Sequence, residues 1–266
     1  MSASSSNVRR APRQLRLLIA TNARLWGAEA EIFSTYFESH DRGAASDAAW
    51  LARQCFKEMM DGMVGRLGLL TCDETDFDAT LTRAVAASTD EVVRVELKHY
   101  VAFSIAYRIS LSEVGGAPVA VARIGSDWPE NDALQSLRAR HRRDYGAIGE
   151  RAAAFTEGGY CTLYRAGMTL AGGSARDGAI AAACAQVYED ELDHMLSGIA
   201  GLAEVPHSVR EWKLLEELTV EQGRWRIRMR NAQFGNPLSA ARIRELEAGA
   251  AEPLAFDYAR AGLSMP

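Results

Sequence analysis

Apolar residues recur along most of this chain at the spacing of one helix face, and little of the chain alternates as a strand does. A clear early example lies between residues 14 and 39, where Leu18, Trp26 and Ile32 fall on one broad apolar face. Glycine-rich turns such as 172–174 interrupt the pattern. The pattern therefore predicts an all-α protein.

Four helices are expected to form the core, and shorter helices are expected to cover it. The expected core helices are 47–70, 90–112, 131–170 and 175–203, with covering helices at 14–39, 208–223 and 238–248. Ser46 and Asp47 are a plausible N-cap for the first core helix. Residues 1–13 are expected to be a disordered tail, and 117–127 could be a short extended piece. The segment 224–230 alternates arginine with apolar residues, so it could be a strand or an amphipathic helix.

Composition indicates one globular domain rather than several. The chain has 266 residues, of which 48% are hydrophobic, and no internal linker rich in Pro, Gly or Ser is visible. A net charge of −5 argues against nucleic acid as the main partner. No apolar run reaches the length of a membrane span or of a signal-peptide core. The four cysteines are scattered without a CxxC pair, which favours a reduced, cytoplasmic setting.

Two Glu-x-x-His motifs are the strongest chemical signal in the sequence. Glu191 and His194 lie within the apolar run 175–203, and Glu96 and His99 lie within 90–112. Residues three apart share one face of a helix, so each motif would present a carboxylate and an imidazole together. Such ligands suit iron, manganese or zinc.

Two metal ions held between four helices need a further carboxylate from each of the other two helices. Glu157 would lie level with Glu191 if the chain turns back near Leu170. In the first half of the chain, a turn after Leu70 would likewise place Glu58 level with Glu96. Asp61 competes with Glu58, and Glu150 competes with Glu157. Glu204 and His207 also have the motif spacing, but Pro206 between them makes a regular helix there unfavourable.

The repeated motif and the helix order resemble the ferritin-like di-iron carboxylate superfamily over residues 47–203. The resemblance implies a single ferritin-like four-helix bundle with extra N- and C-terminal helices. It also implies two iron ions, with a mixed manganese and iron site possible, held by Glu58, Glu96, His99, Glu157, Glu191 and His194. In members that activate oxygen, an Asp before the second motif accepts a hydrogen bond from the metal-bound His of the first motif. In this chain the implied pair is Asp190 and His99.

Departures from individual branches narrow the implied activity. Phe103 stands where a ribonucleotide reductase subunit carries its radical tyrosine, and no cysteine-rich rubredoxin module is present. The resemblance then implies an oxygenase or oxidase that uses O2 to hydroxylate, N-oxygenate or desaturate a small organic substrate. Electrons would come from an external donor such as a separate reductase, or from the substrate, and the chain could form a homodimer. The alternatives are a ferritin-like protein that stores metal or removes peroxide, and a metal-free helical interaction domain.

Other features have both a functional and a structural interpretation. Gly158 and Gly159 could form a π-type bulge beside Glu157 or could simply allow close helix packing. The basic run 138–143 could dock an acidic partner or be a solvated helix face. Several residues near the predicted ligands would line a substrate pocket or the core: Phe103, Tyr107, Cys161, Tyr164 and Cys184.

Overall fold

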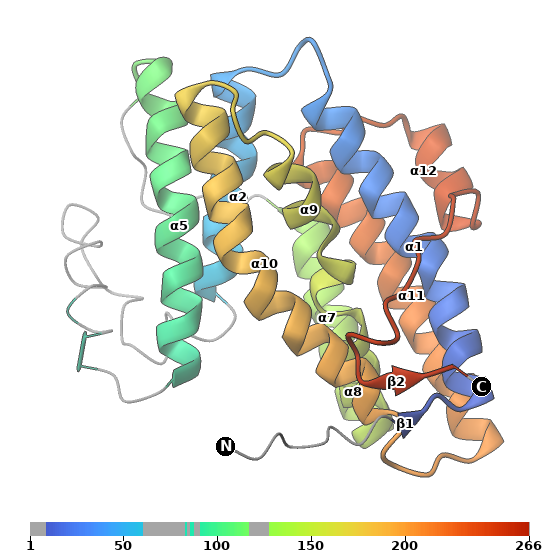
Figure 1. Ribbon diagram of the computed structural model, residues 1–266. Helices are drawn as coiled ribbons and strands as arrows, with labels where there is room; N and C mark the ends of the chain where they lie inside the picture. The colour runs from blue at the N-terminus through green and yellow to red at the C-terminus, as the bar shows by residue number, and fades with distance from the viewer. Residues whose placement is uncertain (1–8, 61–82, 84–85, 88–90, 117–127, 266) are drawn as a thin grey trace.

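The computed structural model describes residues 9–60, 83, 86–87, 91–116 and 128–265, and helices dominate this part of the chain (Figure 1). The all-α prediction is therefore confirmed. The elements in chain order are β1 (Arg9–Arg10), α1 (Arg13–Phe37), α2 (Ala44–Met60), α5 (Glu91–Glu113), α7 (Pro129–Tyr145), α8 (Ala147–Thr156), the 3₁₀ turn η4 (Gly158–Cys161), α9 (Thr162–Met168), α10 (Ala175–Gly201), α11 (Val209–Gln233), α12 (Ala240–Glu247) and β2 (Leu263–Ser264).

Helix α2 begins three residues before its predicted start, and the predicted cap has another role. The Ser46 hydroxyl accepts a hydrogen bond from the Gly43 amide at 3.0 Å and so closes the first turn earlier. Asp47 points inward, where its Oδ1 accepts hydrogen bonds from the Tyr36 hydroxyl at 2.9 Å and the Trp50 indole at 3.0 Å. The predicted stretch 61–70 of this helix, which includes Asp61, lies outside the described residues, as does 117–127.

The predicted helix 131–170 is wrong as a single element, because the chain breaks at two glycine positions. At Gly146, φ is +53°, and the helix axis changes direction between α7 and α8. The backbone of Gly149 then packs so closely that an added Cβ would lie 2.0 Å from the His141 carbonyl oxygen. Two shorter helices therefore fold against each other where one was expected.

The second break is a left-handed turn between α8 and α9. Gly158, Gly159, Tyr160 and Cys161 have φ values of 69°, 55°, 55° and 55°. Left-handed backbone is unfavourable for residues with a side chain, so tertiary contacts must hold Tyr160 and Cys161 there. The feature is thus a full interruption of the helix and not a π-type bulge within it.

Contacts around Tyr160 explain how the turn is held. Its ring stacks on Trp26 of α1 with centroids 4.9 Å apart, and its hydroxyl accepts a hydrogen bond from the Asp257 amide at 2.8 Å. Gly159 lies against the side chains of Glu29 and Arg226, where an added Cβ would be 2.5 Å and 2.3 Å from their polar atoms. The turn therefore depends on α1, α11 and the C-terminal segment together.

The helix predicted at 175–203 is present as α10, and its start follows from the sequence. Ser174 and Asp177 form a capping box, in which each side chain accepts the other's backbone N–H at 3.1 Å. Helix α11 is longer than the predicted 208–223, because the segment 224–230 continues it as helix.

Helix α10 occupies the middle of the described structure (Figure 1). It packs against α5 on one side and against α8, η4 and α9 on the other, and α2 packs on α5. Helices α1 and α11 pack together and cover α7, α8 and α9. Their side chains belong to the same hydrophobic cluster as those of α2, α5 and α10, so the core extends beyond 47–203.

The two ends of the described chain pair as a short parallel sheet, in which Arg9 lies opposite Leu263 and Arg10 opposite Ser264. The predicted disordered tail is therefore ordered from Arg9 onward, and Ala11 is buried. Among the described residues, no helix combines the length and apolar character needed to cross a lipid bilayer.

Candidate metal centre

The interface of α2 with α5 buries a cluster of two carboxylates and one imidazole. Glu58 comes from the last turn of α2, and Glu96 and His99 come from one face of α5. One ligand atom from each residue lies within 4.8 Å of the other two, so the group could hold a metal ion. His99 is fully buried and Glu58 is 3% exposed, so the cluster faces the interior.

The Nδ1 atom of His99 faces a ring of carboxylate oxygens. It lies 3.8 Å from Glu58 Oε2, 3.9 Å from Glu96 Oε2 and 3.7 Å from Glu191 Oε1 of α10. These separations exceed hydrogen-bonding distance, and this buried nitrogen has no hydrogen-bond partner among the described residues. Two metal–ligand bonds of about 2.1 Å each can span such a separation across one cation.

The other ring nitrogen contacts the carboxylate implied by the resemblance. His99 Nε2 lies 3.3 Å from Asp190 Oδ2. An N–H on Nε2 would donate to this carboxylate, which leaves the Nδ1 lone pair directed towards the three glutamates. A lone pair facing three acceptor groups is unfavourable unless a proton or a metal cation lies between them. The separations of 3.7 to 3.9 Å are too long for a hydrogen bond from a protonated Nδ1, so the donor set fits a metal ion.

Electrostatics at Glu191 give a second indication of concentrated negative charge. Burial raises the pKa of the Glu191 carboxyl, and the nearby Glu58 carboxylate raises it further. Lys57, His99 and His194 act in the opposite direction. A bound cation would favour the ionised form of every carboxylate in the group.

The structure does not bring all six predicted ligands into this group. His194 shares a helix with Glu191 but is exposed. Glu157 is also exposed, because α8 ends at Thr156 and Glu157 has extended backbone. The alternative, Glu150, forms an exposed ion pair with Arg142 at 3.0 Å. Nevertheless, the turn after Glu157 does approach the centre, since a Cβ at Gly158 would lie 3.7 Å from Glu191 Oε2.

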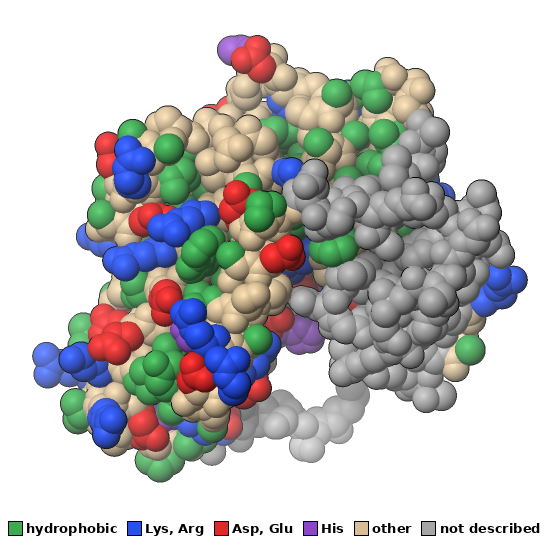
Figure 2. Space-filling model, turned by 180° about the vertical axis from the view of Figure 1, so that it is seen from behind, with side chains coloured by type: hydrophobic (Ala, Val, Ile, Leu, Met, Phe, Trp, Pro, Cys, Tyr) green, Lys and Arg blue, Asp and Glu red, His purple; other side chains and the backbone are tan. Residues whose placement is uncertain are grey.

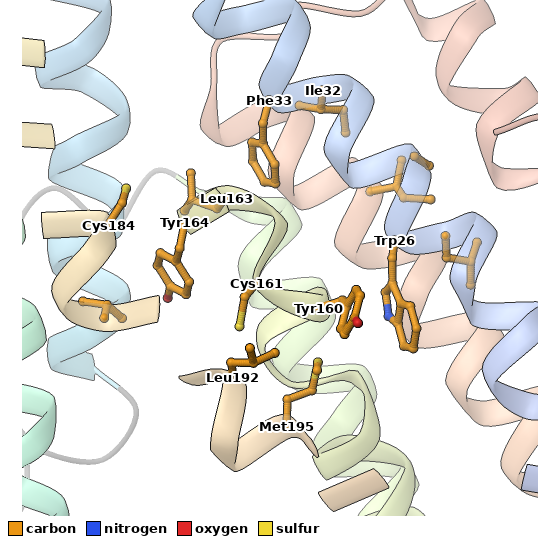
Figure 3. Close-up of a cluster of buried hydrophobic side chains, with 14 of the residues drawn as sticks. Trp26, Ile32, Phe33, Tyr160, Cys161, Leu163, Tyr164, Cys184, Leu192 and Met195 are labelled. Carbon is orange, nitrogen blue, oxygen red and sulfur yellow. The ribbon is translucent and has the colours of Figure 1, made fainter. Parts of the chain in front are cut away.

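The residues predicted to line a substrate pocket are all buried in the main hydrophobic cluster: Phe103, Tyr107, Cys161, Tyr164 and Cys184. Cys161 and Tyr164 lie on the side of η4 and α9 that faces α10, with Cys184 and Leu192 opposite (Figure 3). Burial raises the pKa of Tyr164, and the charges of Glu58 and Glu191 raise it further. Tyr164 therefore lies within the electrostatic influence of the centre.

Sequence reasoning missed a set of buried polar residues behind Glu58. Gln54 Nε2 donates a hydrogen bond to Glu58 Oε1, and Gln54 in turn contacts Arg230 and Gln233 of α11. On the far side of Arg230, its Nε lies 4.0 Å from Oε2 of Glu29 in α1. The available signal was a glutamate in the middle of an apolar helix face, because a charge placed there must be paired.

The basic run 138–143 is largely engaged within the protein. Arg138 is buried and donates to the Thr156 carbonyl oxygen at 3.2 Å, and His141 Nε2 lies 3.1 Å from Glu221 Oε2. The three remaining arginines form exposed ion pairs with acidic neighbours: Arg140, Arg142 and Arg143. Basic and acidic side chains are interspersed on the face shown in Figure 2.

Comparison with known protein families, with curated proteins and with solved structures finds no match for this chain.

Replacing Asp190 by asparagine should weaken metal binding by about 10–100-fold while preserving the fold. Asparagine retains the size of aspartate but lacks the charge that favours an N–H on His99 Nε2. The measurement is the Mn²⁺ dissociation constant, with circular dichroism to verify the fold. Asp193→Asn is the matched control, because Asp193 is exposed on the same helix and pairs with Arg260. Wild-type affinity in Asp190→Asn would contradict the prediction.

Proposed function

We propose that this chain is a metal-dependent oxidoreductase that uses O2 to oxidise a small organic molecule, in the manner of the ferritin-like di-iron oxygenases. The observation that carries the proposal is the buried His99, whose Nδ1 faces three carboxylates without a hydrogen bond while Nε2 contacts Asp190. A helix interface maintained only by packing would not need this concentration of acids.

The residues that would hold the proposed metal centre are Glu58, Glu96 and His99, with Glu191 beside them. Carboxylate and imidazole ligands suit iron and manganese, and these metals when bound would supply the redox chemistry that activates O2. Glu157 and His194 are the proposed further ligands, as the resemblance implies. Both are exposed in the structure, so they could be reached by an ion from solvent.

The protein side chains have separate tasks in this proposal. The glutamates supply the negative charge that a divalent cation needs, and Asp190 holds the proton of His99 on Nε2. Buried apolar and aromatic residues, including Phe103 and Cys161, exclude water from the inner side of the centre. Electrons would come from a separate donor or from the substrate, because the chain has no cysteine spacing typical of an iron–sulfur site.

Metal content and O2 consumption test the proposal directly. Protein purified with iron, or with iron and manganese, should contain about two ions per chain, as dimetal carboxylate bundles do. Elemental analysis measures the content and shows which metal is preferred. Oxygen uptake by the reduced, metal-loaded protein should then increase with a suitable small organic compound and yield an oxidised product in proportion.

Two results would contradict the proposal at different levels. Metal-free protein after purification in the presence of iron and manganese would show that the chain has no such metal centre. Tight metal binding with O2 uptake that no organic compound alters would instead favour metal storage or peroxide removal.

A further inference from the structure

A line of buried polar side chains connects Glu58 with α11, a helix that contributes no ligand. Gln54 precedes Glu58 by one helical turn on α2, and Arg230 and Gln233 approach Gln54 from α11. All four side chains are at most 3% exposed. Burial of so many polar groups is unfavourable unless each finds a partner, so their mutual contacts must be specific.

The chemistry of the donors fixes the direction of the Gln54 amide. Arg230 Nη1 lies 3.2 Å from Gln54 Oε1, and Gln233 Nε2 lies 2.9 Å from the same oxygen. A guanidinium can only donate hydrogen bonds, so the atom of Gln54 that faces Arg230 must be the acceptor oxygen. The amide nitrogen of Gln54 is thereby directed to Glu58 Oε1, to which it donates.

The direction of the Gln54 amide determines which oxygen of Glu58 faces His99. With Oε1 of Glu58 engaged by Gln54, the other oxygen, Oε2, is the one that faces His99 Nδ1 at 3.8 Å. A carboxylate held by a fixed donor keeps one rotamer and remains an acceptor, which a metal ligand requires.

Charge balance explains why an arginine can remain buried here. Glu29 receives two hydrogen bonds from Arg226, at 2.8 Å and 2.9 Å, and its Oε2 lies 4.0 Å from Arg230 Nε. One carboxylate thus serves two guanidinium groups. The next carboxylate along the line is Glu58, which Arg230 reaches through Gln54.

We propose that Gln54 positions the Glu58 carboxylate for metal binding, and that Arg230 sets the direction in which the Gln54 amide faces. This inference rests on the proposed function, since it assigns positioning residues to the same metal centre. It adds α11 to the helices that support the metal centre, although α11 lies outside the residues 47–203 that the resemblance covers.

The first test is Gln54→Leu, with Gln222→Leu as the matched control. Gln222 is equally buried but bonds to Thr156 and His141, so it belongs to another polar network. Gln54→Leu should weaken Mn²⁺ binding by about 10–100-fold and reduce the increase in melting temperature that Mn²⁺ produces. Gln222→Leu should lower the melting temperature equally with and without Mn²⁺ and leave the affinity unchanged.

The second test distinguishes an effect of Arg230 on the Gln54 amide from a general effect of Arg230 on stability. Arg230→Met should weaken Mn²⁺ binding when residue 54 is glutamine but have no further effect in the Gln54→Leu background, because both act through one amide. Gln233→Leu keeps every buried charge but removes both the other donor to Gln54 Oε1 and the acceptor that holds Arg230, so it serves the same purpose if Arg230→Met does not fold.

Four results would count against the inference. Wild-type Mn²⁺ affinity in Gln54→Leu would overturn the role of Gln54. An equal loss of Mn²⁺ affinity in Gln222→Leu would show that the effect of Gln54→Leu comes from loosened packing. An undiminished effect of Arg230→Met or Gln233→Leu in the Gln54→Leu background would show that α11 does not act through the Gln54 amide. Failure of the wild-type protein to bind Mn²⁺ would overturn the metal centre and this inference together.

Discussion

Replacing His99 by alanine is expected to abolish high-affinity metal binding. His99 is the nitrogen donor at which three carboxylates converge, and its Nδ1 has no other partner in the described structure. Loss of a residue that only supports a metal ligand already weakens binding by about 10–100-fold, so loss of a ligand itself should exceed that range. Elemental analysis and Mn²⁺ titration of the purified variant measure the effect.

The control for this experiment is His141→Ala. His141 is also a buried histidine on a helix, and it too has a carboxylate at Nε2, but its Nδ1 is bonded to Gln222 at 3.0 Å. His141→Ala should therefore reduce stability and retain the metal. Undiminished metal binding in His99→Ala would show that the α2–α5 cluster is not the binding site.

A large loss of stability is expected for Glu29→Ala, without any direct contact with the metal group. Glu29 is the buried carboxylate that pairs with Arg226 and lies beside Arg230. Its removal leaves guanidinium charge uncompensated in the interior, which typically destabilises a protein by about 3–5 kcal/mol. For a chain of this size, the melting temperature should decrease by roughly 10 °C, measured by calorimetry or circular dichroism.

Glu31→Ala provides a matched comparison on the same helix. Glu31 receives two hydrogen bonds from Arg242, at 2.7 Å and 2.8 Å, but this pair is about one-third exposed. A partly solvated ion pair contributes only about 0–1 kcal/mol, so the two variants should differ several-fold in their effect. Similar melting temperatures for the two would indicate that Arg226 and Arg230 find water or another partner when Glu29 is removed.

Local sequence signals are sufficient to predict where several helices lie and which residues share a helix face. The apolar periodicity of 14–39 and the turn before Ser174 place α1 and the start of α10. The spacing of Glu96 and His99 was equally informative, since residues three apart on a helix must share a face. Addition of Glu58 from its height on the preceding helix selected the third member of the buried group.

Features that depend on packing between distant segments were not accessible in the same way. The left-handed turn at 158–161 needs Trp26 and the amide of Asp257 to hold Tyr160, and no local pattern shows this arrangement. The sequence predicts only a covering role for the helices outside 47–203, whereas α1 and α11 contribute the buried charges behind Glu58. Apolar periodicity locates helix faces, but it does not show which buried polar groups will meet.

The pairing of β1 with β2 has a consequence for the order in which the protein folds. It joins Arg9 to Leu263 and Arg10 to Ser264, partners that are 254 residues apart, through the hydrogen bonds of a two-residue ladder. So small a contact cannot offset the entropy of closing a loop of that length until the intervening helices are in place. The strand pair should therefore form last and open first, and the Arg9 and Ala11 amides that it protects should exchange with solvent before those of α10.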